Sequence, residues 1–505
     1  MKYQLKGNYF HGKFHHPHAH EKSPDRSISR SCPADLETIL WEMHIRYEVV
    51  DKIVESAVEG QSRWRKTSID EKVSTLRRFK ECVLIKAESM SEAIALETGK
   101  PFWEAKTEIF ALINKIDIII NHSLQRILPK HFSDLSPGTN GHLYYRPIGP
   151  CLIIGPFNFP CNIANNQIAC ALMAGNSIIF KPSEKTSYSG QLLIECYHEA
   201  GFPTGVINLA QGDGELSRRI LKEKAIKGIF FTGSLEAGKK ILANTYHDLS
   251  KLVALELGGK NSSIVCKDAD FNLALRELIK ACFLTSGQRC ISTAIVPIHR
   301  SQYEEFIEKF HCIAKTIVID HPIVHDIEPF MGPLVDQQAL ENYLLYMGMA
   351  KREGIEEIMR GKHLERKHSG YYVSPSIHLA SSFNKNSHFL TNEIFGPNCT
   401  FIPFDEIEEA IQISNSTEFG LAASIFSSDI KNYYKCLEEI DAGQINFNRS
   451  TIGANPQLPF GGVKNSGNYH PAGITTIDSC VFQLAGLEAY DTQNMKDETI
   501  KGVSF

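Results

Sequence analysis

The feature that most constrains the fold of this chain is a regular alternation of short apolar runs with helical segments in its middle third. The runs occupy residues 151–154, 178–180, 206–209, 229–231 and 252–255. Runs this short, bounded by turns and separated by helices, are typical of buried parallel strands joined by crossover helices. We therefore predict an α/β fold with a Rossmann-like, doubly wound parallel sheet.

A second alternating region follows Cys290. It has apolar runs near Ile295, Phe401 and Ile425, with helical patterns at residues 303–314 and 406–415. This pattern predicts a second doubly wound α/β domain. Open parallel sheets bind ligands beyond the carboxyl ends of their strands, so we expect functional side chains just after the apolar runs.

The region before the first sheet is predicted to be a mainly helical layer, from about residue 36 to 127. Ser68 and Glu71 form a capping-box signature that apolar residues follow at helical spacing. Residues 11–30 are polar and irregular, and we interpret them as a solvated loop. This stretch contains five histidines, but their spacing is not that of a closed coordination shell. They are His11, His15, His16, His18 and His20. We predict no metal site.

Composition narrows the function classes. The 505 residues exceed one hydrophobic core, and the net charge of −5 includes no polybasic block, so the ligand is expected to be a small molecule rather than a nucleic acid. Thirteen cysteines without a C-x-x-C pair favour free thiols in a reducing compartment. The start of the chain has no apolar signal region and no run is long enough to span a membrane. We expect a cytoplasmic protein that does not bind membranes.

Three residues carry chemistry by their type and context. Cys290 stands in a small, polar, turn-prone segment that suits an accessible nucleophile. Glu256 ends an apolar strand before two glycines, where partial desolvation would raise its pKa and make it a general base. Asn158 follows a strand in a proline-rich loop and could donate its amide to an oxyanion. The simpler alternatives are a buried apolar cysteine, a solvated strand-end glutamate and a turn-forming asparagine.

Five short blocks resemble the signatures of the aldehyde dehydrogenase superfamily, in that family's order. They are FTGS (231–234), LELGG (255–259), GQRC (287–290), EIFGP (393–397) and PFGG (459–462). The separation of Glu256 from Cys290 also resembles that family's spacing of base and nucleophile. The resemblance extends from about Leu5 to Leu487.

The resemblance implies a mechanism. Cys290 would attack an aldehyde, and the Asn158 amide with the Cys290 backbone N–H would hold the resulting thiohemiacetal oxyanion. After hydride transfer to NAD, Glu256 would activate the water that hydrolyses the thioester, so the product is a free acid rather than an acyl group transferred to coenzyme A.

The resemblance also implies the cofactor contacts. Lys181 and Glu184 resemble the pair that holds the adenosine ribose, and Glu184 would repel a 2′-phosphate, which predicts NAD rather than NADP. The segment from Gly233 and Ser234 to Gly238 is similar to the family's strand-to-helix turn near the pyrophosphate. The remaining predicted contacts, to the nicotinamide ribose, are Glu393 and Phe395.

Four further blocks most resemble dehydrogenases of N-succinylglutamate 5-semialdehyde, which act in arginine catabolism. They are ETGKPFWEA (97–105), INKI (113–116), GNSIIF (175–180) and SGN (466–468). That substrate carries two carboxylates, and Arg449 is a candidate to bind one, although it could equally be a surface arginine. Two features depart from the subfamily: Arg449 replaces its common lysine, and Tyr469-His470-Pro471 replaces a His-Arg-Pro run. Another small aldehyde is therefore a second hypothesis.

The resemblance also predicts the architecture. An NAD-binding domain would comprise residues 1–129 and 148–258, and a catalytic domain residues 259–470. Residues 130–147 and 471–505, with a strand near 479–489, would form an oligomerisation ribbon, which implies a homodimer or homotetramer. A non-catalytic dinucleotide-binding protein on the same scaffold is a third hypothesis, since a fold does not by itself give a function.

Overall fold

The first large sheet of the computed structural model contains all five predicted strands. The structure describes residues 1–16, 24–324, 326–491 and 501–503. The strands are β7 (Cys151–Ile154), β8 (Ile178–Lys181), β9 (Ile207–Leu209), β10 (Gly228–Thr232) and β11 (Leu252–Glu256). They are parallel in the order β11-β10-β7-β8-β9, and two short antiparallel strands, β1 (Asn8–Phe10) and β2 (Lys13–His15), extend the edge. The predicted parallel sheet is confirmed.

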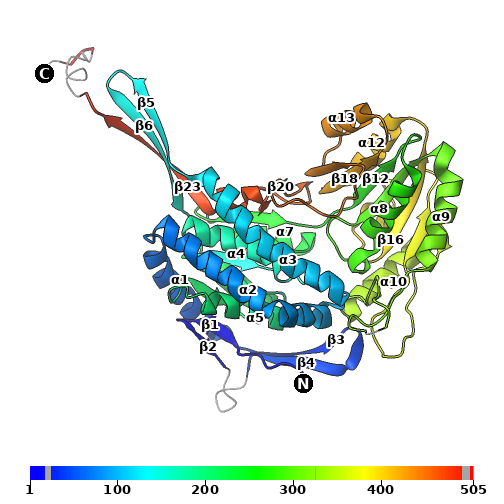
Figure 1. Cartoon of the computed structure of the whole chain (residues 1–505), viewed down its shortest axis with the longest axis horizontal. Helices are drawn as coiled ribbons and strands as arrows, with labels where there is room; N and C mark the ends of the chain where they lie inside the picture. Colours follow the sequence, from blue (N-terminus) through cyan, green and yellow to red (C-terminus); the bar gives the residue numbers. More distant parts are fainter. Residues whose placement is uncertain (17–23, 325, 492–500, 504–505) are drawn as a thin grey trace.

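Helices cover both faces of this sheet, as a doubly wound fold requires. One face packs against α4 (Asn162–Ala174) and α5 (Ser187–Glu199), which α2 (Ile69–Thr98) and α3 (Phe102–Ile118) cover in turn. The other face packs against α1 (Val50–Trp64), α6 (Gly214–Lys222) and α7 (Leu235–Thr245). Figure 1 shows α2 and α3 as long helices lying side by side across the sheet. The Ser68 hydroxyl accepts a hydrogen bond from the Glu71 amide at 3.2 Å and caps α2 as predicted.

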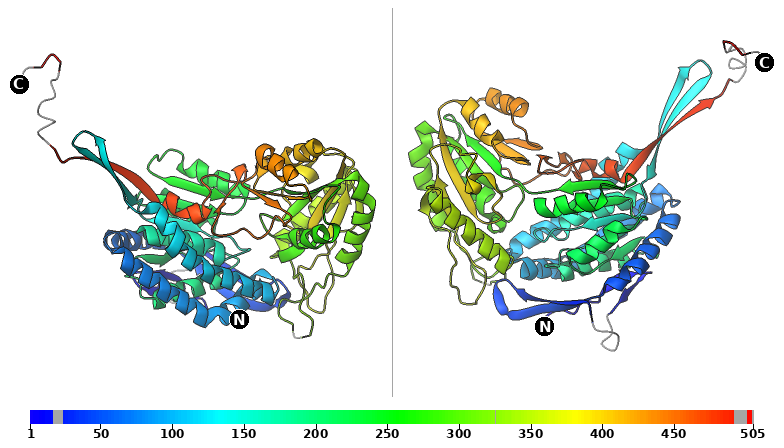
Figure 2. Two further views of the ribbon diagram at one scale, coloured as in Figure 1. Left: turned by 45° about the horizontal axis from the view of Figure 1, so that its top comes forward. Right: turned by 180° about the vertical axis from the view of Figure 1, so that it is seen from behind.

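The prediction of a helical layer from about residue 36 was wrong for its first residues, which form a strand. Residues 26–45 form an antiparallel hairpin of β3 (Arg26–Cys32) and β4 (Asp35–Ile45), so the predicted solvated loop is partly strand as well. The period-two pattern was present in the sequence, because Trp41, Met43 and Ile45 are buried while the residues between them are exposed. Figure 2 shows the hairpin running beneath both halves of the molecule.

Of the predicted histidine cluster, His18 and His20 lie outside the described residues. His15 stacks on Phe10 with ring centroids 3.7 Å apart, and His11 lies 3.8 Å from the Glu59 carboxylate. Among the residues that the structure describes, no group of three or more His, Cys, Asp or Glu side chains could hold a metal ion.

The second large sheet has the order β14-β15-β16-β13-β12-β18-β19, with only β14 antiparallel. Its strands are β12 (Asn261–Val265), β13 (Thr293–His299), β14 (Glu356–Met359), β15 (Ser376–Leu379), β16 (Asn398–Phe404), β18 (Ala422–Phe426) and β19 (Gln444–Phe447). Its main helices are α8 (Phe271–Phe283), α9 (Tyr303–Lys315), α10 (Gln337–Arg352), α12 (Ile407–Asn415) and α13 (Ile430–Glu439). The predicted second α/β unit is therefore confirmed.

A three-stranded arm projects from the body, as Figure 1 shows. It consists of β5 (Lys130–Ser136), β6 (Thr139–Pro147) and β23 (Val481–Ala489), in the order β23-β6-β5. Every residue of β5 is exposed. Within the described residues, none of the helices is both long enough and apolar enough to cross a membrane.

Candidate active site

A cleft of about 710 Å³ lies beyond the carboxyl ends of the first sheet. The loops that follow β7, β8, β10 and β11 form one wall, and Cys290, Glu393 and Phe395 contribute from the second sheet's side. The position agrees with the general rule for ligands of open parallel sheets. The cleft therefore brings together side chains from both halves of the chain.

Cys290 lines this cleft and follows a strained turn. The preceding residues Thr285, Ser286 and Gly287 all have positive φ, at 57°, 55° and 67°. A Cβ at Gly287 would lie 2.3 Å from the Gly396 carbonyl oxygen, so the close approach requires glycine. Burial, and then the carboxylates of Glu256 and Glu393, raise the pKa of the Cys290 thiol above its ordinary value. A raised pKa favours the thiol over the thiolate.

Glu256 is the last residue of β11 and is almost completely buried, with 2% of its surface exposed. Neither of its carboxylate oxygens has a hydrogen-bond partner among the described residues. Burial raises its pKa well above the ordinary value. The SGN block predicted from the resemblance supports this strand end, because the Asn468 Oδ1 accepts from the Leu255 amide at 2.7 Å. A buried carboxyl group without partners next to a thiol is suited to accepting a proton.

Asn158 lies in the loop after β7 and is 5% exposed. Its Nδ2 donates to the Gln288 carbonyl oxygen at 2.9 Å, two residues before Cys290, and its Oδ1 accepts from the Phe159 amide at 3.1 Å. An amide nitrogen has two hydrogens, so one remains to donate to a ligand. Cys290 and Asn158 thus line one end of the cleft, and Glu256, which does not line it, lies close enough to raise the pKa of the Cys290 thiol.

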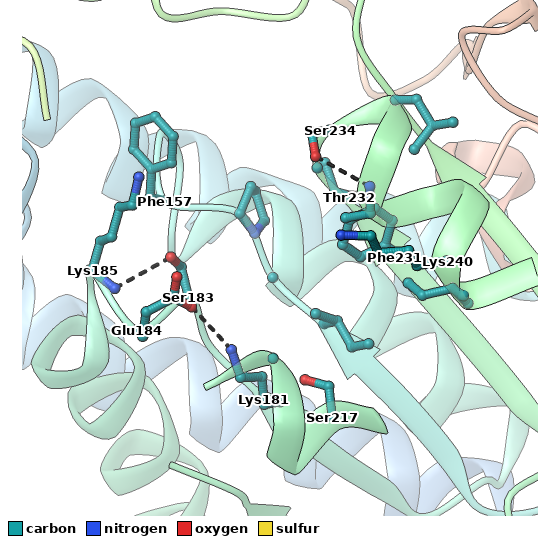
Figure 3. A pocket seen from close by; sticks show the side chains of 18 of the residues that line it. Phe157, Lys181, Ser183, Glu184, Lys185, Ser217, Phe231, Thr232, Ser234 and Lys240 are labelled. Carbon is teal, nitrogen blue, oxygen red and sulfur yellow. Dashed lines mark hydrogen bonds and ion pairs between the residues drawn. The ribbon is translucent and has the colours of Figure 1, made fainter. Parts of the chain in front are cut away.

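The other end of the cleft holds Lys181 and Glu184, and Figure 3 shows this pair across from the turn at Ser234. Lys181 Nζ and Glu184 Oε2 are 3.3 Å apart. Burial opposes ionisation of Glu184, but the Lys181 ammonium and the Glu184 backbone N–H lower its pKa below the ordinary value. A half-buried anionic carboxylate here can accept hydrogen bonds from ribose hydroxyls and repel a phosphate.

The strand-to-helix turn after β10 has the geometry of a phosphate-binding turn. Gly233 and Ser234 line the cleft, and the Ser234 hydroxyl accepts from the Ala237 amide at 3.3 Å to cap α7. Gly238 does not line the cleft; a Cβ there would lie 2.8 Å from a Leu257 methyl group, so it allows α7 to approach the sheet closely. The residues present therefore fit a dinucleotide, with a helix N-terminus available to the pyrophosphate.

Glu393 and Phe395 enter from the second sheet's side. The Glu393 Oε1 accepts from the Gly259 amide at 3.0 Å, and the Phe395 ring packs edge-on against Phe157 at 5.8 Å between centroids. Burial raises the pKa of Glu393 to about 7, although the Gly259 N–H and the Lys260 charge oppose the shift. Both side chains line the cleft between its two ends.

Arg449 is exposed and does not line the cleft. It follows Asn448, which has a φ of 52°. Arg449 and Cys290 therefore do not share this cleft, and substrate binding by Arg449 stays a prediction.

Sequence reasoning missed several residues that line the cleft. Lys185, next to Glu184, pairs with Asp336 of the second α/β unit at 2.7 Å, and its ammonium lies 4.9 Å from the centre of the Phe157 ring. Lys185 follows Glu184 and Phe157 precedes Asn158 in the chain, and this adjacency was the only indication in the sequence that they line the cleft. Arg218 and Lys240, from α6 and α7, also line the cleft but belong to no motif.

Comparison with known proteins assigns the family. The sequence profile of the aldehyde dehydrogenase family matches residues 19–481. N-succinylglutamate 5-semialdehyde dehydrogenase of Novosphingobium aromaticivorans is 33% identical over 440 residues, covering 87% of this chain and 92% of that protein. The protein of that name from Legionella pneumophila strain Corby is 33% identical over 488 residues, 96% of this chain and 95% of its own.

Solved structures share the whole fold. An NAD-dependent aldehyde dehydrogenase from Sinorhizobium meliloti superposes with a TM-score of 0.91 at 25% identity, covering 97% of this chain and 95% of its own. Betaine aldehyde dehydrogenase from Staphylococcus aureus, solved in complex with NAD+, has a TM-score of 0.90 at 24% identity over 99% of both chains. The predicted fold is confirmed, and this chain belongs to the aldehyde dehydrogenase family.

Proposed function

We propose that the protein oxidises an aldehyde to a carboxylic acid with NAD, through a covalent intermediate on Cys290. The observation that carries this proposal is the buried carboxyl of Glu256, which has no hydrogen-bond partner among the described residues and raises the pKa of the cleft-lining Cys290 thiol. Lys181, Glu184, Gly233, Ser234, Glu393 and Phe395 would hold the cofactor, with Gly238 packing its turn. The solved relatives that are NAD-dependent or bind NAD+ support this choice of cofactor.

In the proposed mechanism, the Cys290 thiol releases its proton to solvent as its sulfur bonds to the aldehyde carbon, and the resulting thiohemiacetal oxyanion receives hydrogen bonds from the Asn158 amide and the Cys290 backbone N–H. The loss of one such donor typically costs about 3 to 4 kcal/mol of transition-state stabilisation. Bound NAD would accept the hydride that leaves the thiohemiacetal carbon, and this carbon then becomes the carbonyl carbon of a thioester. Glu256 then accepts a proton from the water that attacks the thioester carbon, the carbon–sulfur bond breaks, and the acid leaves with the thiol restored.

We propose N-succinylglutamate 5-semialdehyde as the substrate. Support comes from the two relatives of that name, each 33% identical over most of this chain. Steady-state kinetics with a panel of aldehydes and both nicotinamide cofactors tests the proposal. The expected result is the highest kcat/KM for this semialdehyde with NAD, and no turnover after Cys290→Ala. Activity that survives this substitution would exclude Cys290 as the nucleophile.

The second candidate is a different small aldehyde or semialdehyde. The observation that favours it is the exposed position of Arg449 away from the cleft, together with the departure at residues 469–471, where the Tyr469 side chain is 62% exposed. A substrate with two carboxylates needs cationic or amide partners. Arg449→Ala separates the candidates. A rise in KM for succinylglutamate semialdehyde would support a role for Arg449 in binding a carboxylate of that substrate. An unchanged KM would exclude this role and favour the second candidate.

We propose the division into an NAD-binding domain (1–129 and 148–258), a catalytic domain (259–470) and an oligomerisation ribbon (130–147 and 471–505). The membership of the two large sheets and the arm supports it. The β3–β4 hairpin is an exception to this division. Its residues fall within the proposed NAD-binding domain, but its apolar side chains pack in one cluster with helices of the second sheet.

We also propose a cytoplasmic homodimer or homotetramer assembled through the arm. Apolar side chains on its strands are exposed, among them Leu135 at 59% and Leu487 at 77%. Exposed strand edges with apolar side chains favour association. A monomer in sedimentation velocity at micromolar concentration would contradict the assembly.

A further inference from the structure

We propose that Glu104 and Glu108, two buried carboxylates one turn apart on α3, are positioning residues for the reaction. Each holds one of the two loops that meet at Cys290. Both residues are 1% exposed, and their helix lies outside the five family blocks, although Glu104 falls in the block at residues 97–105. The inference rests on the proposed roles of Cys290 and Asn158.

Glu108 holds the loop that carries Asn158, here called the oxyanion loop (residues 155–162). Its Oε1 accepts from the backbone amides of Cys161 and Asn162 at 3.0 and 3.1 Å, where α4 begins. Its Oε2 lies 2.8 Å from Lys100 Nζ, and both side chains of this pair are fully buried. Lys100 Nζ in turn donates to the Asn158 carbonyl oxygen. One ion pair therefore holds the backbone at Asn158 and at the end of the same loop.

Glu104 holds the loop that carries Cys290, here called the nucleophile loop (residues 285–290). Its Oε1 accepts from the Thr285 hydroxyl and from Arg289 Nη2, the latter at 2.7 Å. Arg289 Nε also donates to Thr285 Oγ1 at 2.7 Å. These contacts bracket the three residues with positive φ that precede the nucleophile. Because such backbone persists only where its surroundings over-determine it, the Glu104 contacts help to hold Cys290 in place.

Phe159 joins the two loops. Lys100 Nζ lies 3.8 Å from the centre of its ring, and the Arg289 guanidinium carbon lies 5.0 Å from it. The ring therefore contacts one cation from each carboxylate's pair, and a desolvated cation over an aromatic ring is attracted to it. With the hydrogen bond from Asn158 to the Gln288 carbonyl, this contact fixes the two loops relative to each other.

Removal of the Glu108 charge should reduce catalysis only through Asn158. A displacement of about 1 Å in a catalytic group can cost about 100-fold in rate, so we expect Glu108→Gln to lower kcat/KM about 10- to 100-fold. In an Asn158→Ala background the same substitution should cost less than about twofold, since residues that act as a unit are non-additive. The KM for NAD should stay unchanged, because Glu108 contacts no cofactor-binding residue named above.

Two matched variants serve as controls. Glu97→Gln removes a carboxylate equally buried on α2, which binds Trp41, Tyr188 and Ser189 rather than either loop, and it should leave kcat/KM unchanged in both backgrounds. Glu104→Gln acts on the nucleophile loop, so its loss of kcat/KM should persist in the Asn158→Ala background. If that loss disappears there, the assignment of Glu104 to the nucleophile loop is wrong.

The outcomes separate this inference from the proposed function. If Asn158→Ala alone leaves kcat/KM unchanged, the proposed oxyanion role fails. If Asn158→Ala impairs turnover and Glu108→Gln lowers kcat/KM by its full factor in that background as well, the two effects are independent. Only the positioning role of Glu108 then fails. If Glu108→Gln does not fold, Lys100→Met with Glu108→Gln removes both buried charges together and leaves none uncompensated. This double variant, checked by thermal melting, should show the same non-additivity with Asn158→Ala.

Discussion

Buried carboxylates of this enzyme occur in two contrasting environments. On α2 and α3, Glu97 and Glu108 meet partners with both oxygens; Glu97 accepts from Trp41 Nε1, the Tyr188 and Ser189 amides and the Ser189 hydroxyl. At the end of β11, Glu256 is as deeply buried and has no hydrogen-bond partner among the described residues. Glutamate is thus a hydrogen-bonded structural support on α2 and α3, whereas at the end of β11 it lacks hydrogen-bond partners among the described residues.

The contrast shows where the fold accepts an energetic cost. A buried polar group that lacks partners typically costs about 1 to 3 kcal/mol, and more when charged, whereas a fully bonded one holds its surroundings rigid. The support on α3 contacts the loops at Cys290, while the unsupported carboxyl acts on the thiol itself. We infer that the partnered carboxylates fix geometry and that Glu256 is left free to exchange protons.

The largest expected effect comes from removing the proton acceptor. Glu256→Gln should lower steady-state kcat about 10²- to 10⁴-fold, the usual contribution of general-base catalysis. Since only deacylation needs the base, rapid-mixing absorbance at 340 nm, about where NADH absorbs, should show one burst of NADH per site before turnover stalls. Undiminished steady turnover would show that Glu256 is not the base.

A smaller effect, on stability alone, is expected from a partnered carboxylate. Glu97→Gln replaces an acceptor oxygen with an NH₂ group that faces donors, so it should lower the free energy of unfolding by about 1 to 3 kcal/mol. Denaturant unfolding measures this loss, and Glu256→Gln, which breaks no hydrogen bond in this structure, serves as the comparison. If Glu97→Gln lowers kcat while stability is unchanged, the contrast between the two environments fails.

The smallest effect is a pH dependence of stability. Burial raises the pKa of Glu256 well above its ordinary value, so folding favours the protonated form. The stability from this preference is present below the unfolded-state pKa of about 4.3 and is lost as pH rises through the folded-state pKa. Glu256→Gln stays neutral, so its Tm relative to the parent should rise by about 2 °C between about pH 5 and pH 9. A difference that stays constant with pH would mean that Glu256 has an ordinary pKa in the folded protein.

Much of the fold was predictable because its signals are local. The five apolar runs became β7 to β11, and Ser68 with Glu71 capped α2, since periodicity and capping depend on residues that are neighbours in the chain. The hairpin at residues 26–45 was missed, although Trp41, Met43 and Ile45 alternate with polar residues. Its short alternating segment adjoins strongly helical sequence, and the helical assignment was extended too far.

For the candidate site, the motifs predicted which side chains would meet, but not how each is held. Cys290 and Asn158 line one end of the cleft, next to Glu256, while Arg449 is exposed elsewhere. Glu104 lies in the block at residues 97–105, but nothing in that block assigned it a role, and the loop partners of Glu104 and Glu108 lie far along the chain.

The sequence by itself determined the family, the two parallel sheets and the residue types at the reacting centre, since those depend on composition, periodicity and short motifs. Only the tertiary structure decided which buried charges have partners and which do not. Desolvation and ion pairing arise between segments far apart in the chain, as between Glu104 and Arg289, which are 185 residues apart. No local pattern encodes the surroundings that leave Glu256, near Cys290, without a hydrogen-bond partner in the part of the chain that the structure describes.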